Sequence, residues 1–199
     1  FVLTTWFLVL AAYSFGQLPI ASMGPPALPQ AVTTGASPEA LSAWGVVEAW
    51  LKGPAQVFLI NNPISGVLIL IGLIVSSPWS AFFAAVGAAV ALAVSLGLGA
   101  SLSDVTAGLY GFSPVLTAVA LGCVFYTPSL RGAAFALLGT IFTVIVQGAL
   151  DAGIAPAGIP TFTAPFVFVT WLFLLPKADL QPHPHAPIKG GILDKKAKS

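Results

Sequence analysis

Residues 53–66 form a polar stretch within a long apolar region, with one glutamine, two asparagines and one serine. Two prolines and two glycines interrupt this stretch, and proline disrupts a helix because it has no backbone N–H to donate. In lipid, an interrupted helix is tolerated only inside protein or beside a water-filled cavity. Amide side chains at such an interruption therefore predict the lining of a polar passage.

Two later segments also place glycine and proline between apolar residues. In residues 108–116, Gly111 and Pro114 argue against a continuous straight span. In residues 159–166, Pro165 introduces the last apolar helix after two threonines. Interrupted helices of this kind direct backbone carbonyls or amides toward a cavity.

Residue sets that build enzymes or metal sites are not evident in the sequence. The apolar region has no Ser/His/Asp set, no phosphate-binding loop and no paired carboxylates. The one cysteine, Cys123, lies in an apolar run and is expected to be a small buried hydrophobe. His183 and His185 lie in a proline-rich tail, where disorder is favoured over metal binding. We expect no enzyme, no cofactor, no metal and no nucleic-acid partner.

The composition indicates a polytopic membrane protein. Of 199 residues, 57% are hydrophobic and only 7% are charged, and the mean hydropathy is +0.98. A soluble domain has about 25% charged residues, which disfavours that class. We therefore expect an all-α membrane protein, a bundle with broken or re-entrant helices.

Apolar runs and turn signals divide the chain into helices. An apolar helix is expected over residues 1–15, and Ser37-Pro38-Glu39 has the cap, proline and acid that begin an amphipathic helix. Further helices are expected over residues 64–75, 79–98, 116–126, 132–150 and 166–175. The alanines and glycine of residues 79–98 favour close helix packing.

The remaining segments predict a linker and a tail. Residues 16–38 are rich in Pro, Gly, Ser and Thr and are expected to form a linker. Residues 177–199 carry five lysines and are expected to form a disordered tail. Lysine-rich ends stay in the cytoplasm, and the one arginine, Arg131, lies on the same side if residues 132–150 run outward.

An internal repeat relates the two ends of the apolar region. When the sequence is aligned with itself at an offset of 165 residues, five residues match an identical one: Phe1, Val2, Thr5, Trp6 and Leu10. A chance match between Phe- and Val-rich helices is the alternative. A real repeat makes residues 1–15 the last helix of a first unit and residues 39–176 a complete second unit. The chain is then expected to be a fragment of a two-repeat protein, and such repeats are typical of transporters.

Three segments, in order, resemble the urea transporter family. Residues 56–66, QVFLINNPISG, resemble the family's QVxxxNNPxSG segment, and residues 108–116, GLYGFSPVL, are similar to its GLYGFxxxL segment. Residues 159–166, IPTFTAPF, are similar to LPxxTxPF, with Ile159 in place of leucine. The likeness covers about residues 39–176.

The resemblance implies a pore enclosed by two inverted halves, in a homotrimer with one pore in each subunit. It implies passive, channel-like permeation of urea across the lipid bilayer, in a bacterial inner-membrane protein with a cytoplasmic C-terminus. A fragment with one half and the last helix of the other is not expected to conduct by itself.

The resemblance also assigns five pore residues: Gln56, Val57, Phe112, Leu116 and Thr163. Gln56 faces the pore and Val57 packs the central site, although Gln56 can equally be a structural amide that bridges helices. Phe112 and Leu116 press on the flat faces of urea, or else pack an ordinary core. Thr163 points its hydroxyl into the pore, or else bonds back to a helix carbonyl.

Other roles and functions remain open at this point. Asn61 and Asn62 are expected to cap the helix break and not to touch the solute. An ion-coupled transporter with Asp104 or Asp151 as proton carrier is one alternative, although Asp104 also fits a helix cap. A water-channel-like pore for another small neutral solute and a non-conducting membrane subunit are the others.

Overall fold

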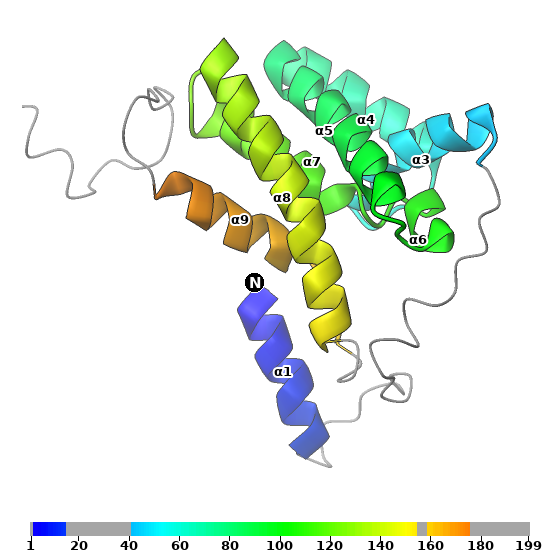
Figure 1. Ribbon diagram of the computed structural model, residues 1–199, viewed down its shortest axis with the longest axis vertical. Coiled ribbons are helices and arrows are strands. Elements are labelled where there is room, and N and C mark those ends of the chain that lie inside the picture. The colour runs from blue at the N-terminus through cyan, green and yellow to red at the C-terminus, as the bar shows by residue number, and fades with distance from the viewer. Residues whose placement is uncertain (1, 15–40, 155–158, 176–199) are drawn as a thin grey trace, which may run out of the picture.

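The computed structural model describes residues 2–14, 41–154 and 159–175, and these ranges fold as helices without a strand (Figure 1). The helices are α1 Val2–Ser14, α3 Ala43–Gln56, α4 Pro63–Ser76, α5 Pro78–Gly97, α6 Leu102–Thr106, α7 Phe112–Val119, α8 Leu130–Ile154 and α9 Ala164–Leu174. A π-helical segment, η1 Ala120–Val124, continues α7. The expected linker and tail lie outside the described residues.

Two of the described helices are long enough to cross a bilayer. α5 and α8 have 20 and 25 residues and a mean hydropathy of 2.0, and a span needs about 20 residues. The shorter helices α1, α4 and α9 are apolar too. Large apolar side chains such as Phe7, Val75 and Leu130 are exposed, which suits a surface that faces equally apolar lipid tails. The predicted all-α membrane fold is confirmed.

Short hydroxyl residues set several helix ends. The Ser42 hydroxyl accepts a hydrogen bond from a backbone N–H in the first turn of α3, at 3.0 Å. The expected start at Ser37 lies outside the described residues, but α3 begins later than expected, at Ala43, because Ser42 supplies its cap. Ser77 ends α4 and caps α5, and Pro78 follows at the first helical position, where proline loses no hydrogen bond.

The core forms where small residues of α5 let α7 approach. Ala84 and Ala88 are buried beside Val115, and a Cβ added to Gly87 would lie 2.6 Å from the Cβ of Ala118. Small residues allow this close approach of helices in membranes. The predicted packing face of residues 79–98 is confirmed.

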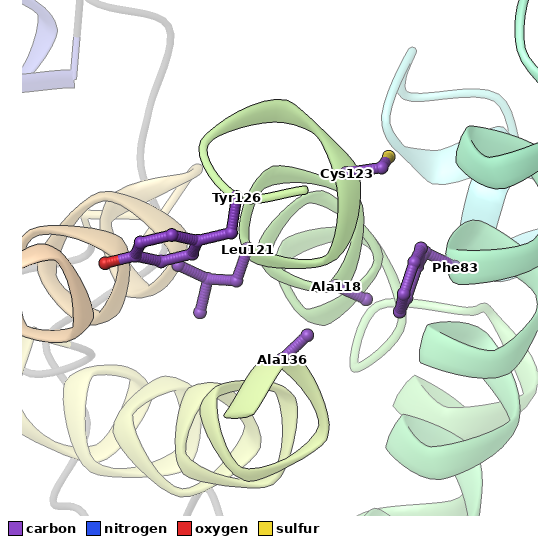
Figure 2. Close-up of a cluster of buried hydrophobic side chains, with 6 residues drawn as sticks. All are labelled: Phe83, Ala118, Leu121, Cys123, Tyr126 and Ala136. Atoms are coloured by element: carbon purple, nitrogen blue, oxygen red, sulfur yellow. The ribbon is translucent and has the colours of Figure 1, made fainter. Parts of the chain in front are cut away.

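A second cluster joins η1 to α5, α8 and α9 (Figure 2). Phe83 of α5 is 2% exposed, and Leu121 of η1 is fully buried. The Tyr126 hydroxyl donates a hydrogen bond to the Phe173 carbonyl oxygen at 3.2 Å, and the Phe173 ring lies 4.9 Å from that of Phe135. The start of α8 therefore lies beside the end of α9, so the two helices are antiparallel.

Three boundaries differ from those expected. α8 begins at Leu130, so Arg131 lies in its first turn and not in a loop. The same helix continues past Asp151, because an aspartate keeps its backbone N–H and only weakly disfavours a helix. α7 begins ahead of Pro114, because the first turn is the part of a helix that tolerates proline.

α1 contacts the segment that precedes α9. The Trp6 indole N–H donates a hydrogen bond to the Pro160 carbonyl oxygen at 3.0 Å, and Val2 is buried. In Figure 1 the N-terminal end of α1 points toward α9. The two helices that carry the matched residues of the expected repeat are therefore neighbours, while the repeat itself stays a prediction.

Candidate functional site

The first helix interruption covers residues 57–62, between α3 and α4. Leu59 has a φ of 59°, a left-handed conformation that is uncommon for leucine. The Asn62 side chain accepts a hydrogen bond at 2.8 Å from a backbone N–H in the first turn of α4, which confirms its predicted capping role. Most side chains of this interruption are exposed, so it is a local turn at the surface.

The second interruption covers residues 107–111, between α6 and α7, and its backbone lies against α3. Gly108 has a φ of 78°, and a Cβ there would lie 2.8 Å from the backbone of Lys52. A Cβ on Gly111 would lie 2.6 Å from the Cα of Gly53. Glycine is required at both positions because any other residue would overlap α3.

α3 also supports α4 directly. A Cβ added to Gly66 would overlap the carbonyl of Leu51. Three consecutive residues of α3, Leu51, Lys52 and Gly53, therefore touch the helix after the first interruption and the backbone of the second. α3 is the common platform of both interruptions.

Two buried glutamines donate hydrogen bonds to the second interruption. The Nε2 of Gln56 donates to the Ala107 carbonyl oxygen at 2.7 Å, and the Nε2 of Gln147 donates to the Leu109 carbonyl oxygen at 2.6 Å. The side chains are 6% and 2% exposed. A carbonyl in a membrane protein that has lost its helical partner needs such a donor. The bridging role left open for Gln56 is therefore present.

A cavity of about 450 Å³ opens beside this interruption. Phe112, the first residue of α7, lies on its wall together with Leu59 of the first interruption. Its polar wall includes Asp104, Tyr110, Gln147, Asp151 and Thr161. The Thr161 hydroxyl is hydrogen-bonded to the Asp151 carboxylate. The cavity combines apolar surface with several hydrogen-bond acceptors, an arrangement that suits a small solute rich in N–H donors.

Thr163 lies on a different cavity. It immediately precedes α9, and its side chain makes no capping hydrogen bond. It lines a space of about 190 Å³ together with Val2 and Leu3 of α1 and Trp171 of α9. Thr163 therefore belongs to the groove between α1 and α9.

The remaining pore candidates pack around α7. Val57 contacts the cluster of Ala84, Ala88 and Val115. Leu116 is half-buried, one helical turn after Phe112 and on the same face of α7. Of the five residues expected in the pore, the larger cavity holds only Phe112 and the smaller only Thr163. The other three, Gln56, Val57 and Leu116, line neither cavity, so the common role of the five stays a prediction.

Gln147 is the residue of this region that the sequence reasoning missed. It is the only side-chain amide in residues 132–150. An isolated polar residue in an apolar span is costly unless it is paired or functional, so a search for such residues would have found it. Tyr110 and Thr161 carry weaker signals, since each lies in a short loop before a helix.

These observations define an integral membrane protein made of helices, in which two interrupted helices rest on one platform beside a polar cavity. The chain belongs to the urea transporter family, whose family model, described as Urea transporter, matches residues 1–178.

Curated relatives agree with this membership. Urea transporter 1 of Ovis aries is 31% identical over 135 residues, and urea transporter 1 of Rattus norvegicus is 30% identical over 135 residues. Each alignment covers 68% of this chain and 35% of the relative. For urea transporter 1 of Mus musculus, the identity is 32% over 130 residues, which cover 62% of this chain and 33% of the relative. The chain thus spans about a third of the length of the relatives it matches.

Proposed function

We propose that the complete protein lets urea cross the membrane passively, through a channel-like pore. Family membership supports urea as the solute, because the relatives bear that name. The observation that carries the mechanism is the interruption at residues 107–111, which packs its glycines against α3 and leads into Phe112 on the wall of a polar cavity. An interrupted helix beside a cavity is the usual form of a midplane site in transporters.

The proposed site residues suit the shape of urea, which is small, flat and neutral, with four N–H donors and one carbonyl acceptor. Gln56 has its Nε2 engaged with Ala107, so its Oε1 is the atom that accepts a urea N–H. Phe112, Val57 and Leu116 supply apolar surface for the flat faces, and the Thr163 hydroxyl can donate or accept. A charged group at these positions would cost about 2.5–3.5 kcal/mol in the membrane.

The pore is proposed to need two inverted halves. Residues 39–176 form one half, and residues 1–15 are the last helix of the other. The neighbouring positions of α1 and α9, which share a groove, support this pairing. The proposal includes a homotrimer in a bacterial inner membrane.

The orientation is proposed to place the C-terminus in the cytoplasm. Since α8 and α9 are antiparallel, Arg131 and Leu175 lie at the same end of the bundle. A basic residue at that end agrees with the positive-inside rule.

Urea efflux from liposomes that contain the complete gene product tests the function. We expect the rate to follow the urea gradient alone and to stay the same when sodium and proton gradients are collapsed. Thr163→Val is expected to lower the rate without changing the amount of folded protein, because it removes a hydroxyl from the path. A rate that requires an ion gradient contradicts the proposal.

A second candidate is an ion-coupled transporter, which is favoured by one observation. Asp104 and Asp151 both lie on the wall of the larger cavity, where a carboxylate can carry a proton. In that case Asp104→Asn or Asp151→Asn abolishes transport. An unchanged urea rate in both variants removes this candidate.

A further inference from the structure

We propose that Gln147 is a positioning residue for the solute path: it fixes the second interruption from the α8 side and thereby fixes the place of Phe112. The inference rests on the proposed function to the extent that Phe112 contacts the solute. The Gln147 Nε2 donates its hydrogen bond at 2.6 Å to Leu109, three residues before Phe112.

The backbone of the interruption satisfies only some of its own carbonyls. The Gly111 N–H donates to the Gly108 carbonyl oxygen at 3.0 Å. It therefore does not pair with the Ala107 carbonyl, which would be its partner in an α-helix. Pro114 has no N–H to donate to the carbonyl of Tyr110, four residues earlier. Two donors from other helices, Gln56 and Gln147, supply hydrogen bonds to the carbonyls of Ala107 and Leu109, since an unpaired carbonyl away from water is costly.

The interruption is held from two sides by different means. On the α3 side, Gly108 and Gly111 lie against the backbone, and Gln56 adds its hydrogen bond to Ala107. On the α8 side, the bond from Gln147 is the only hydrogen bond among the described residues that reaches residues 107–111. Without the bond from Gln147, residues 107–111 stay packed against α3 but are free to move on the α8 side.

Packing alone does not explain a glutamine at this place. The side chain is 2% exposed, and its Oε1 has no hydrogen-bond partner among the described residues. A leucine of similar size would fill the space without burying an unpaired oxygen. The hydrogen bond that the Nε2 donates to the Leu109 carbonyl oxygen therefore explains why an amide side chain occupies this position.

The position of Phe112 depends on this bond. Phe112 and Leu59 line the same cavity from the two interruptions, so a shift of residues 107–111 changes the distance between two apolar walls. That distance discriminates a flat solute such as urea from bulkier analogues. When the two walls move apart, the flux of a bulkier analogue increases more than the flux of urea. Gln147 itself lines this cavity, and the bond from its Nε2 to Leu109 acts on selectivity by fixing the place of Phe112.

The test compares Gln147→Leu with Thr143→Val in the complete gene product. Thr143 lies one turn earlier on α8, is fully buried, and bonds to the Thr117 hydroxyl at 2.9 Å. Both variants remove one buried polar contact of α8, but only Gln147→Leu acts on the interruption. We expect the ratio of urea flux to N-methylurea flux to fall about tenfold in Gln147→Leu, the factor that corresponds to one hydrogen bond. The ratio is expected to stay at the wild-type value in Thr143→Val.

Hydrogen exchange supplies a readout that does not depend on transport. The amides of residues 108–112 are expected to exchange faster in Gln147→Leu and unchanged in Thr143→Val. If Gln147→Leu is not recovered folded, Gln147→Met serves, because it is unbranched and also lacks the donor. A wild-type flux ratio together with wild-type exchange overturns the inference. Absence of urea flux in the wild type overturns the proposed function, and the exchange measurement then still decides the role of Gln147.

Discussion

The two helix interruptions solve the same physical problem by different means. At residues 57–62 the chain turns at the surface, and Asn62 caps the next helix with its own side chain. At residues 107–111 two glycines are buried against α3, and the carbonyls of Ala107 and Leu109 are paired by Gln56 and Gln147, which are 51 and 38 residues away in sequence from their acceptors. The first solution is local and the second depends on the packing of three helices.

The comparison shows which interruption is suited to hold a solute site. A surface turn with a local cap is set by its own residues and depends little on the bundle, because it has few buried contacts. An interruption that packs against a neighbouring helix and is paired from two sides keeps its geometry, and fixed geometry is what selective binding requires. The second interruption is therefore the rigid wall of the cavity, and the first one completes that wall with Leu59.

The largest effect is expected from Gly111→Ala, which breaks the contact of the second interruption with α3. The new Cβ would lie 2.6 Å from the Cα of Gly53, and two backbones cannot yield as a flexible side chain can. We expect a loss of about 3 kcal/mol or more in the free energy of unfolding, or no folded protein.

Thermal unfolding in detergent measures this effect, with Gly72→Ala as the control. Gly72 lies on α4, and no atom lies within 4 Å of its added Cβ, so this change is expected to be neutral or to stabilise by up to about 1 kcal/mol. Equal unfolding temperatures for Gly111→Ala and the wild type would contradict the close approach.

A smaller effect is expected from Gln56→Leu. The substitution leaves the half-buried Ala107 carbonyl without its donor, at a cost of about 1–3 kcal/mol in the free energy of unfolding. Unfolding of the purified variant in detergent gives the value. A change below about 0.5 kcal/mol, the usual range of surface substitutions, would show that water or another group replaces the amide.

The smallest effect is expected from Asn62→Ala at the first interruption. Loss of a helix cap costs about 1 kcal/mol, and the exposed N–H can then bond to water. Asn62→Ser keeps a capping oxygen and serves as the matched control, with an unfolding temperature close to that of the wild type. If Asn62→Ala is more destabilising than Gln56→Leu, the first interruption is the more constrained of the two and the comparison is reversed.

The sequence predicted what local chemistry determines. Asn62 followed by Pro63 indicated a capped helix start, and the glycines near residues 108–111 indicated an interruption. The alanines of α5 indicated a packing face, because small residues in a membrane-spanning helix let a neighbouring helix approach closely. The three ordered motifs then indicated the family.

The sequence did not predict the contacts that hold the second interruption. Lys52 and Gly53 become neighbours of Gly108 and Gly111 only after α3 has packed onto the bundle. Gln147 finds Leu109 for the same reason, since α8 must first pack against α7. Pairings over such distances follow from tertiary packing, which residue types and spacing do not specify. The division of Phe112 and Thr163 between two cavities is of the same kind.

Urea flux through liposomes that hold equal amounts of folded Gln56→Leu, Asn62→Ala and wild-type complete gene product tests the central claim most directly. The account predicts that Gln56→Leu lowers the urea rate by about tenfold or more, because it removes both a pore acceptor and a buried hydrogen bond. Asn62→Ala is predicted to keep the wild-type rate. Equal rates in Gln56→Leu and the wild type would contradict the claim that urea passes beside the second interruption.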